Sequence, residues 1–536
     1  MTINMKNIIK GLAVAVCFSA MLTSCTKNFE YFNTNQYEAT DELMDRDNLR
    51  TGAFFNQMQR VVIIYADGTL LDSDYQVCYN LLADSYAGYL APTGSWNNGV
   101  HTGSYFMTPG WARSLFSRKY ETAMNAWVEL NLNATAQGDV PQIVALGNIL
   151  KVANMHQVTD YYGPIPYSEV GTTLNAAYDA QEDIYKKFFE ELGSAIDVLN
   201  DYKNGNPGVP VLADYDYVYG GDVTKWIKFA NSLRLRLAMR VAYADPALAQ
   251  AEAEKSVNDQ TGLMTEASDW AGINKAYTNY VHPIQQCNAF NHGETQMGAS
   301  MDSYLNGYKD PRLAKFFKVA GDGSYHGVRN GIVGSTWSKY GNAEGNVSAP
   351  NLGSANISWM NASEVYFLLA EGALRGWNMG GTPQEFYEKG IRTSFDENGV
   401  SGADTYLANT TAKPADFVDN TNSGNGTSAP STVTIAWDEA ADDEAKLEKI
   451  MTQKWIALFP NGCEAWAEYR RTGYPKLLPV VVNSSEGAVS SELQIRRVTF
   501  PYDEYENNAA AVMGGVSKLG GQDNVGTKLW WDKKPR

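Results

Sequence analysis

The sequence predicts a mainly α-helical protein, built from pairs of helices with loop-rich segments between them. Apolar residues recur every three or four positions over long stretches, as they do along one face of a helix. The clearest pair of helices, residues 361–395, has about the 34-residue length of a tetratricopeptide-like hairpin. With 536 residues, of which 44% are hydrophobic, the chain is long and apolar enough to bury a large core.

The first segment has the pattern of an export signal. Two lysines among the first ten residues precede an apolar run, 11–21, that is too short to span a bilayer. The run leads into Leu-Thr-Ser-Cys, which resembles the lipobox of bacterial lipoproteins, where the cysteine is lipidated. We therefore expect residues 1–24 to be a signal peptide and Cys25 to carry the lipid. The polar residues 25–40 would tether a single helical body, 41–536.

Most of the predicted helices lie before residue 256. Pro141 suits the first turn of a helix, because its missing N–H would have no partner there. Asp222 is a good N-cap for a later helix. We expect the arginines of that helix, Arg234, Arg236 and Arg240, to be paired within the structure rather than to bind a ligand. The predicted helices of this part are 48–65, 74–90, 111–131, 140–159, 184–199 and 226–241.

The pair at 361–395 carries two candidate N-terminal caps. Asn361 and Glu364 have the spacing of a capping box. Thr382 and Glu385 have the same spacing at the start of the second helix. Gly376 lies between them and predicts the end of the first helix.

The stretch 453–475, QKWIALFPNGCEAWAEYRRTGYP, predicts two helices joined by a tight turn. Pro460 cannot continue a helix, and the Asn-Gly pair that follows it tolerates positive φ. We expect the Trp and Tyr side chains of this stretch to lie in the core. We expect Arg470 and Arg471 to bind nearby carbonyl or carboxylate groups of the protein itself rather than a substrate.

Charge and cysteine content narrow the possible functions. The formal net charge of −17 argues against nucleic-acid binding, which needs a basic surface. Cys17 and Cys25 belong to the predicted signal and lipid site. At least one of the other three cysteines must be unpaired in a monomer, and we expect buried, inert thiols whose pairing stays open. These three are Cys78, Cys287 and Cys463.

The sequence shows no enzymatic motif. It has no GxSxG elbow, no HExxH, no P-loop and no GxGxxG after a strand. His282 and His292 are only a weak candidate for a zinc pair. A turn and a helix cap explain Asp214, Asp216 and Asp222 better than a calcium loop does. We therefore predict no catalytic residues, cofactor or metal, although a structural calcium ion and a carboxylate pair for glycoside hydrolysis stay open.

Four stretches resemble a known family. All four are similar to the SusD/RagB (SusD-like) outer-membrane nutrient-binding lipoproteins. Together with the lipobox and TKLWWD near the C-terminus, they extend the similarity in order along the chain to Trp531. The stretches are 453–475, TDYYGPIPYSE at 159–169, GDVTKWIKFANSLRLRLAMR at 221–240, and ASEVYFLLAEGALRGWNMGGTPQEFYEKGI at 362–391.

The resemblance implies a fold and a function. The fold is a tetratricopeptide-like helical-hairpin scaffold with an irregular, loop-rich region packed against it. The function is capture of a nutrient, foremost an oligosaccharide or polysaccharide, and its delivery to a SusC-like TonB-dependent outer-membrane transporter. Such a protein would be non-enzymatic, anchored in the outer membrane by its lipid, and would face the cell exterior.

The segments 91–107, 256–345 and 400–435 are loop-rich. We expect ligand specificity to be built in residues 256–340, because loops carry binding on a rigid scaffold. Aromatic rings can stack on the CH faces of sugars, while amide side chains bond to the hydroxyls. The alternative for Trp96 and Trp337 is that their side chains pack into the scaffold and bind no ligand. The candidate ligand residues are Trp96, Asn97, Asn98 and Tyr105 in the first segment, and Trp337, Tyr340 and Asn342 in the second.

Two other functions stay open. A lipid-anchored glycoside hydrolase would cleave its glycan and would depend on a single Asp or Glu. A peptide-binding member of the same family would differ from a glycan-binding one only in its ligand. The sequence does not identify the ligand or the residues that contact a transporter.

Overall fold

The computed structural model describes residues 48–67, 70–94, 96–138, 140–332, 339–340 and 345–535. The predicted signal peptide, the lipid site, the tether and the candidate ligand residues Trp337 and Asn342 lie outside these ranges. The described residues from Thr51 onward form one compact unit. Within the described ranges, no helix is both long enough and apolar enough to cross a membrane.

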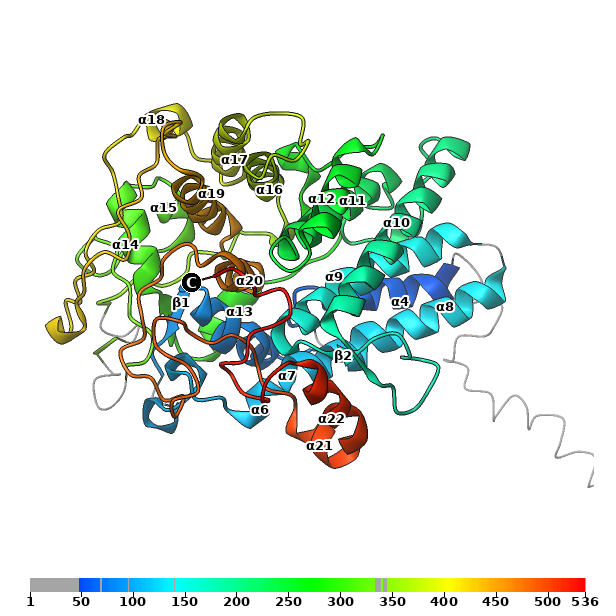
Figure 1. Cartoon of the computed structure of the whole chain (residues 1–536), viewed down its shortest axis with the longest axis horizontal. Coiled ribbons are helices and arrows are strands. Elements are labelled where there is room, and N and C mark those ends of the chain that lie inside the picture. Colours follow the sequence, from blue (N-terminus) through cyan, green and yellow to red (C-terminus); the bar gives the residue numbers. More distant parts are fainter. Residues whose placement is uncertain are drawn as a thin grey trace, which may run out of the picture. The chain divides into compact units, whose positions relative to one another are not determined.

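Helices packed in sequence form the scaffold of this unit. Consecutive helices pack on one another from α8 to α12, and α16 packs on both α17 and α19. In Figure 1 these helices follow one another in an arc from α8 to α19. The predicted mainly α fold is confirmed. The scaffold helices are α8 (Asn125–Gln137), α9 (Pro141–Tyr162), α10 (Gln181–Gly205), α11 (Val223–Arg240), α12 (Pro246–Asn258), α16 (Ala362–Leu374), α17 (Pro383–Glu397), α19 (Asp443–Leu458) and α20 (Gly462–Thr472).

Local sequence signals set the starts of several scaffold helices. Pro141 occupies the first turn of α9, as predicted. Asp222 caps α11, where its carboxylate accepts a hydrogen bond from the backbone N–H of Lys225. Thr382 and Glu385 form the predicted capping box at the start of α17. In these helices the local pattern was sufficient to place the first turn.

The predicted capping box of Asn361 and Glu364 is wrong. Asn361 precedes α16, but its side chain makes no cap bond. Arg236 on α11 instead donates to both carboxylate oxygens of Glu364, at 2.7 and 2.6 Å. A bidentate, charge-assisted pair with a guanidinium is stronger than one bond to a backbone N–H, so the carboxylate turns towards α11.

Two of the predicted helices are divided and contain π-helical turns. The predicted helix 74–90 ends before residue 90, because Leu90 is the first residue of strand β1 (Leu90–Pro92). Its π-helical part packs on α20, where an added Cβ on Gly462 would lie only 2.1 Å from Oδ1 of Asp84. The first divided helix consists of α5 (Asp72–Tyr75) and the π-helix η2 (Gln76–Asp84), and the second of α6 (Pro109–Ala112), α7 (Ser114–Arg118), the π-helix η5 (Lys119–Met124) and then α8.

Short two-stranded antiparallel sheets join loop segments that are distant in sequence. The first places Pro92 opposite Thr295 and so brings the loop after it beside residue 294. The third contains an irregular register at Gly272. The strand pairs are β1 (Leu90–Pro92) with β5 (Thr295–Met297), β2 (Ile165–Pro166) with β3 (Tyr178–Asp179), and β4 (Ala271–Ile273) with β6 (Ile357–Met360).

The segment 256–345 is more helical than predicted. Its helices are too short to show a repeated apolar stripe, which is why the sequence pattern missed them. α13 starts at a cap in which Nδ1 of His282 accepts from the backbone N–H of Ile284. The segment 400–435 is largely irregular, as predicted. The short helices of these segments and of the tail are α13 (Pro283–Phe290), α14 (Ala299–Tyr308), α15 (Leu313–Phe316), α18 (Ala403–Leu407), α21 (Tyr502–Asn507) and α22 (Ala509–Lys518).

The stretch 453–475 lies in the core. Trp455 and Trp466 are buried. The guanidinium carbon of Arg470 lies 3.5 Å from the centroid of the Trp466 ring, and Arg470 donates to the backbone oxygen of Asp160 at 2.6 Å. Arg471 is equally buried and binds carboxylates on α16 and α20. The predicted structural role of both arginines is confirmed.

The arginines of α11 are also paired within the scaffold, as predicted. Their guanidinium groups lie among carboxylates from four other helices, so these charges tie the layers of the scaffold together. The pairs are Arg234 with Glu252, Arg236 with Glu364, and Arg240 with Asp160 and Glu464.

The three remaining cysteines are free and buried, as expected. Burial raises the pKa of the Cys287 and Cys463 thiols to about 12, and it raises the pKa of Cys78 as well. Thiolate is the nucleophilic form, so none of the three is poised for reaction near neutral pH.

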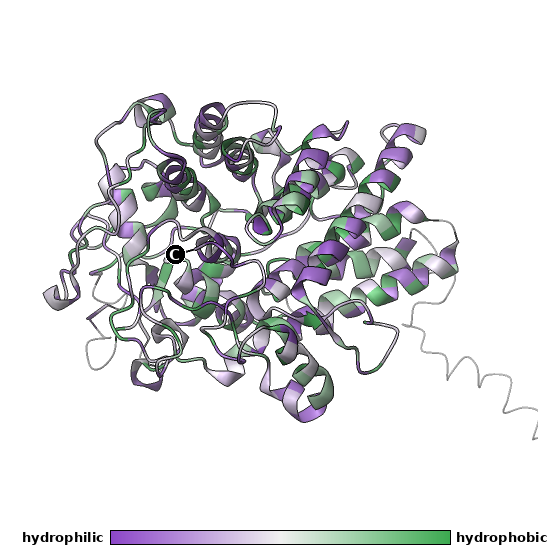
Figure 2. Cartoon of the chain, viewed as in Figure 1, coloured by the Kyte–Doolittle hydropathy of each residue, from purple (hydrophilic) through white to green (hydrophobic). Residues whose placement is uncertain are grey.

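Most helices in Figure 2 alternate between hydrophobic and hydrophilic residues along their length, as amphipathic helices do.

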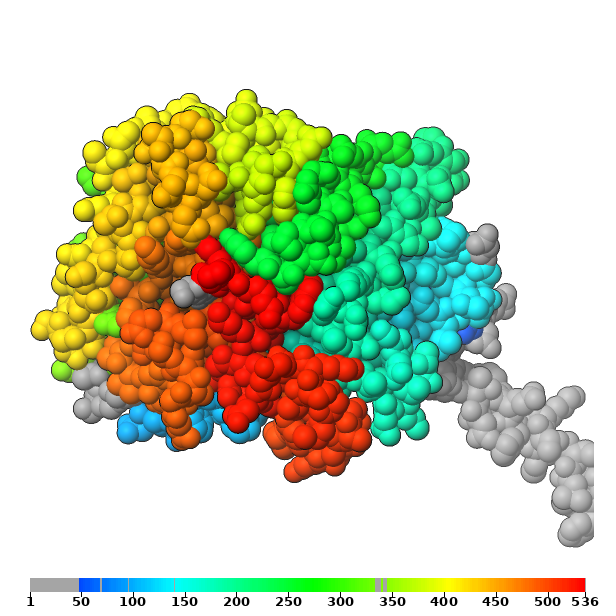
Figure 3. Space-filling model, in the orientation of Figure 1, coloured from blue at the N-terminus to red at the C-terminus, as the bar shows by residue number. Residues whose placement is uncertain are grey.

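The C-terminal segment is part of the folded body. In Figure 3 the red C-terminal segment lies between the teal and green helical segments and the orange segment. Trp531 is fully buried there, and its indole N–H donates to Oδ1 of Asp160 at 2.8 Å. The tail therefore completes the core beside α9.

Candidate functional site

The candidate site is the loop that follows β1. The backbone N–H of Thr93 donates to the backbone oxygen of Glu294 at 2.8 Å and extends the β1–β5 pairing into this loop. Ala91 within β1 packs with Ile332, Tyr340 and Val347 in a small apolar cluster. The structure therefore brings the loop of Trp96 close to the described residues that flank the second predicted ligand segment.

Trp96 begins a tight turn, η3 (Trp96–Gly99), whose geometry depends on asparagine. Asn97 and Asn98 both have left-handed backbone conformations, with φ of 49° and 52°. Asparagine tolerates this region better than most residues. The side chain of Asn97 donates to the backbone oxygen of Val100 at 2.8 Å. Asn98 is exposed, and within the described part of the chain its amide makes no hydrogen bond.

Trp96 belongs to an aromatic cluster at the surface. Its ring lies 6.3 Å from that of Trp111, nearly perpendicular to it, and 5.9 Å from that of His101. Trp96 and Trp111 are both partly exposed, whereas His101 is buried. Burial lowers the pKa of His101 to about 4, so the imidazole is neutral at pH 7. Its Nδ1 accepts from the backbone N–H of Gly103 at 3.1 Å, which holds the ring in place.

A carboxylate lies beside this cluster. A Cβ added to Gly94 would lie 2.6 Å from a carboxylate oxygen of Glu294 and 2.8 Å from the Trp96 ring, so both groups lie over this glycine. Partial burial raises the pKa of Glu294, which is consistent with its position against an indole ring. Phe290, which lies four residues before Glu294 at the end of α13, is 48% exposed.

Sequence reasoning missed Glu294 and Trp111. The sequence pattern places Trp111 in a helix, and no local spacing links Glu294 to the Trp96 loop. Only the register of β1 with β5 brings the two segments together. The one local hint was Gly94 two residues before Trp96, because a glycine there lets two side chains approach the backbone.

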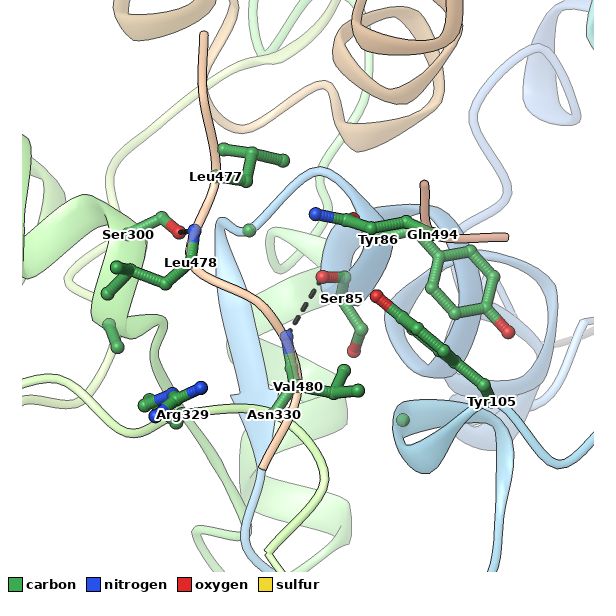
Figure 4. Close-up of a pocket in the computed structure, with 13 residues that line it drawn as sticks. Ser85, Tyr86, Tyr105, Ser300, Arg329, Asn330, Leu477, Leu478, Val480 and Gln494 are labelled. Atoms are coloured by element: carbon green, nitrogen blue, oxygen red, sulfur yellow. Dashed lines mark hydrogen bonds between the residues drawn. The ribbon is translucent and has the colours of Figure 1, made fainter. Parts of the chain in front are cut away.

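The structure places the two predicted tyrosines below the surface. Tyr105 is 3% exposed and its ring lies 6.1 Å from that of Tyr86. Figure 4 shows both rings at a cavity of about 20 Å³, which has room for one water molecule rather than a sugar. Tyr340 is buried, and its hydroxyl donates to Asp419 at 2.7 Å and accepts from Asn425 at 3.0 Å. Both rings act as supports of their loops in this structure.

The residues considered for metal binding serve as caps and turns. Asp216 accepts from the backbone N–H groups of Val218, Tyr219 and Gly221 and from the indole N–H of Trp226. These bonds fully occupy its carboxylate in a turn before α11. Among the described residues, no group of three or more His, Cys, Asp or Glu side chains is arranged to hold a metal ion.

The comparison with known families agrees with this architecture. The sequence matches the SusD-like family, described as Susd and RagB outer membrane lipoprotein, over residues 31–532. The chain belongs to the SusD-like family. The resemblance seen in the sequence is thereby confirmed, and with it the tetratricopeptide-like helical fold of these lipoproteins.

Solved SusD-like structures cover nearly the whole described body. A chitin-binding SusD homologue from Flavobacterium johnsoniae is 40% identical, with a TM-score of 0.86 over 90% of this chain and 99% of that one. A SusD homologue from Bacteroides vulgatus is 34% identical, with a TM-score of 0.85 over 91% and 98%. One from Bacteroides thetaiotaomicron is 38% identical, with a TM-score of 0.81 over 91% and 99%. No curated protein matches the chain.

Proposed function

We propose that this SusD-like protein captures a glycan on the surface formed by Trp96, Trp111, Asn97, Asn98 and Glu294, which we call the Trp96 surface. The observation that carries this proposal is the meeting of the Trp96 ring and the Glu294 carboxylate over Gly94. An aromatic face beside a hydrogen-bond acceptor suits the two sides of a sugar, its CH face and its hydroxyls.

The loop is built to hold this arrangement before ligand arrives. The Asn97 bond to Val100 and the His101 bond to Gly103 fix the turn on both sides of the exposed Asn98. A preformed surface loses little conformational entropy on binding. The Asn98 amide can then donate to one sugar hydroxyl while Glu294 accepts from another.

A relative supports the choice of ligand. The Flavobacterium johnsoniae homologue with 40% identity is a chitin-binding protein. Oligomers of N-acetylglucosamine are therefore the first probes, and their acetamido groups add a donor and an acceptor that Glu294 and Asn98 can meet.

The test is calorimetry on the detergent-solubilised full chain with chitohexaose, cellohexaose, maltoheptaose and a mixed peptide library. We expect saturable binding of at least one glycan. Trp96→Ala should weaken it by about tenfold or more, because stacking and burial of one indole are worth at least ~1.4 kcal/mol. Trp437→Ala is the matched control, since the Trp437 indole N–H donates to Glu439 away from this surface.

Two outcomes would contradict glycan capture at this surface. Full retention of affinity in Trp96→Ala would show that the glycan binds elsewhere. Binding of peptides but of no glycan would favour the peptide-binding alternative.

A glycoside hydrolase is the second candidate, because burial raises the pKa of Glu294, and that is the direction that a general acid needs. Hydrolysis also needs a second carboxylate, within about 10 Å of the first. We propose that Glu294 binds rather than catalyses. Incubation with chitohexaose followed by chromatography decides this point. Release of shorter oligomers by the native chain, and its loss in Glu294→Gln, would establish the hydrolase instead.

We further propose that the protein is lipid-anchored at the outer membrane, faces the cell exterior and passes its glycan to a SusC-like TonB-dependent transporter. Its family of outer-membrane lipoproteins supports the anchoring. Co-purification of such a transporter with the native protein, and loss of glycan uptake when the gene is deleted, are the expected results. Uptake at the normal rate without the protein would contradict delivery.

A further inference from the structure

A cleft elsewhere in the protein shares no residue with the Trp96 surface. It has a volume of about 430 Å³ and lies where α15, β6 and the end of α17 meet. Small-molecule sites commonly have volumes of about 300–1,000 Å³. We call it the Trp270 cleft. Its walls include Trp270, Lys315 and Phe316, the asparagines Asn351, Asn356, Asn361 and Asn398, and the acidic residues Asp396 and Glu397.

Trp270 supplies an aromatic face to this cleft. An added Cβ on Gly272 would lie 2.9 Å from Cζ3 of the indole, so the ring lies close against this glycine of β4. The same Cβ would lie 2.1 Å from the backbone oxygen of Ile357 on β6, so only glycine fits at this position. The ring is partly exposed, and within the described ranges its indole N–H has no hydrogen-bond partner. The strand pair therefore holds an indole whose polar edge is unused.

Amide groups line the cleft with free donors and acceptors. Asn356 is exposed, and its amide makes no hydrogen bond to any described residue. Asn398 donates to the backbone oxygen of Ser394 at 2.7 Å, which leaves its side-chain oxygen available. Asn361 accepts from the hydroxyl of Ser358 with its oxygen, which leaves its N–H groups available. Sugar hydroxyls both donate and accept, so they match such half-used amides.

The charged groups do not make this an ion-binding site. Lys315 and Asp396 have opposite signs, are exposed, and form no ion pair with any described residue. The carboxylate of Glu397 is already used, because it accepts from the backbone N–H of Ser363 at 3.0 Å and from the Ser363 hydroxyl. An uncharged ligand suits this balance better than an anion or a cation does.

The base of the cleft is apolar. The rings of Phe316 and Phe459 pack with centroids 4.7 Å apart, and both residues line the cleft. Glu397 at the end of α17 bonds to the first turn of α16. The walls are therefore anchored in the helical scaffold, which makes a preformed site.

We propose that the Trp270 cleft is a second carbohydrate-binding site, which takes a neutral sugar unit of a glycan. The sugar stacks on Trp270 and bonds to Asn356, Asn361 and Asn398. This inference stands on the cleft alone and does not require the Trp96 surface to bind a glycan.

The test is ¹⁹F nuclear magnetic resonance on the detergent-solubilised full chain containing 5-fluorotryptophan. The signals of Trp96 and Trp270 are assigned from the variants Trp96→Phe and Trp270→Phe. Chitohexaose, cellohexaose, maltoheptaose and xylohexaose are then titrated separately. We expect at least one of them to shift the Trp270 signal saturably, and to do so in the Trp96→Phe variant as well.

The two signals separate the two proposals. A response of Trp96 alone would overturn the second site and leave the proposed function intact. A response of Trp270 alone would support the second site and overturn the Trp96 surface. If neither signal responds to any of the glycans, both proposals fail.

Amide variants test the contacts within the cleft. For the glycan that shifts Trp270, Asn356→Ala should weaken binding by about fivefold, the value of one hydrogen bond of ~1 kcal/mol. The exposed Asn420 lies outside the cleft, so Asn420→Ala is the matched control and should leave affinity unchanged. Equal affinity in both variants would overturn the assignment of Asn356 as a ligand contact.

Discussion

His282 shows at the scale of one residue how burial decides a protonation state. Its side chain caps α13 through Nδ1 and is 3% exposed. Burial, with a smaller effect of Lys275, lowers the pKa of His282 to about 3. The unfolded chain therefore takes up a proton on this residue at a higher pH than the folded chain does. The stability that the neutral imidazole contributes is present above about pH 6.5, and it is lost as the pH falls towards 3.

We expect His282→Asn to make the protein less sensitive to acid. Asparagine can still cap α13 but does not titrate. Between pH 7 and pH 5 the native chain should lose about 2 kcal/mol more free energy of unfolding than the variant, because the unfolded histidine is protonated in this range. Urea denaturation at both pH values measures the difference. The exposed His292→Asn is the control, and an equal loss in native chain and His282→Asn would contradict the assignment.

At the scale of elements, the buried pair of Arg236 and Glu364 connects α11 to α16. Both residues are almost fully buried, and Arg236 also donates to the backbone oxygen of Trp359 at 2.9 Å. The hairpin α16–α17 is therefore joined to the preceding helices by a charge pair as well as by apolar packing. A sequence pattern assigns Glu364 to its own helix, because a capping box is a local signal.

We expect Glu364→Gln to destabilise the protein by about 3 kcal/mol, because it removes the close bidentate partner of the buried Arg236 and leaves only the longer contact to Glu464 at 3.7 Å. The double variant Arg236→Met, Glu364→Met should recover much of this loss, since it removes both charges and keeps apolar volume. Thermal and urea unfolding measure both. A double variant that is less stable than Glu364→Gln would show that the pair contributes net stability rather than only avoiding an unpaired charge.

At the scale of the whole described body, the C-terminal segment closes the core. Asp160 on α9 accepts from the indole N–H of Trp531, from the hydroxyl of Tyr185 at 2.6 Å and from Arg240 at 3.2 Å. The next residue after Trp531 is also tied in, because Asp532 forms a buried ion pair with Arg496. One carboxylate thus joins α9, α10, α11 and the tail.

We expect Trp531→Ala to destabilise the body by about 3–5 kcal/mol, the range for removing a large aromatic side chain from a core. Trp530→Ala is the matched control, because the neighbouring Trp530 is only partly buried and packs on Tyr185 at 6.1 Å. Its loss should be clearly smaller. Urea denaturation of both variants is the measurement, and equal losses would show that the tail does not close the core at Trp531.

Much of the fold could be predicted because its signals are local. Pro141, Asp222 and the Thr382–Glu385 box set helix starts through bonds within a few residues, and the structure has them where the sequence placed them. The burial of Trp455 and Trp466 follows from helical periodicity in the same way. The short helices α13 to α15 could not be predicted, because each has too few turns to show a period.

The candidate site was predicted only in part. The turn at Trp96–Asn98 lies at the surface, whereas Tyr105 and Tyr340 are buried, although both loops combine aromatic and amide residues. Composition indicates which side chains can stack on a sugar but does not indicate which face solvent. That depends on Tyr86 and Asp419, which reach the two rings from other parts of the chain.

The sequence by itself determined the family, the helical class, the starts of three scaffold helices and the structural role of Arg470 and Arg471, because periodicity, caps and signature stretches are properties of neighbouring residues. The tertiary structure alone decided that Glu364 binds Arg236 and that Glu294 lies beside Trp96. It also assembled the Trp270 cleft from five separate segments. Such contacts join residues far apart in the chain, and their partners are fixed by packing and strand register rather than by local spacing.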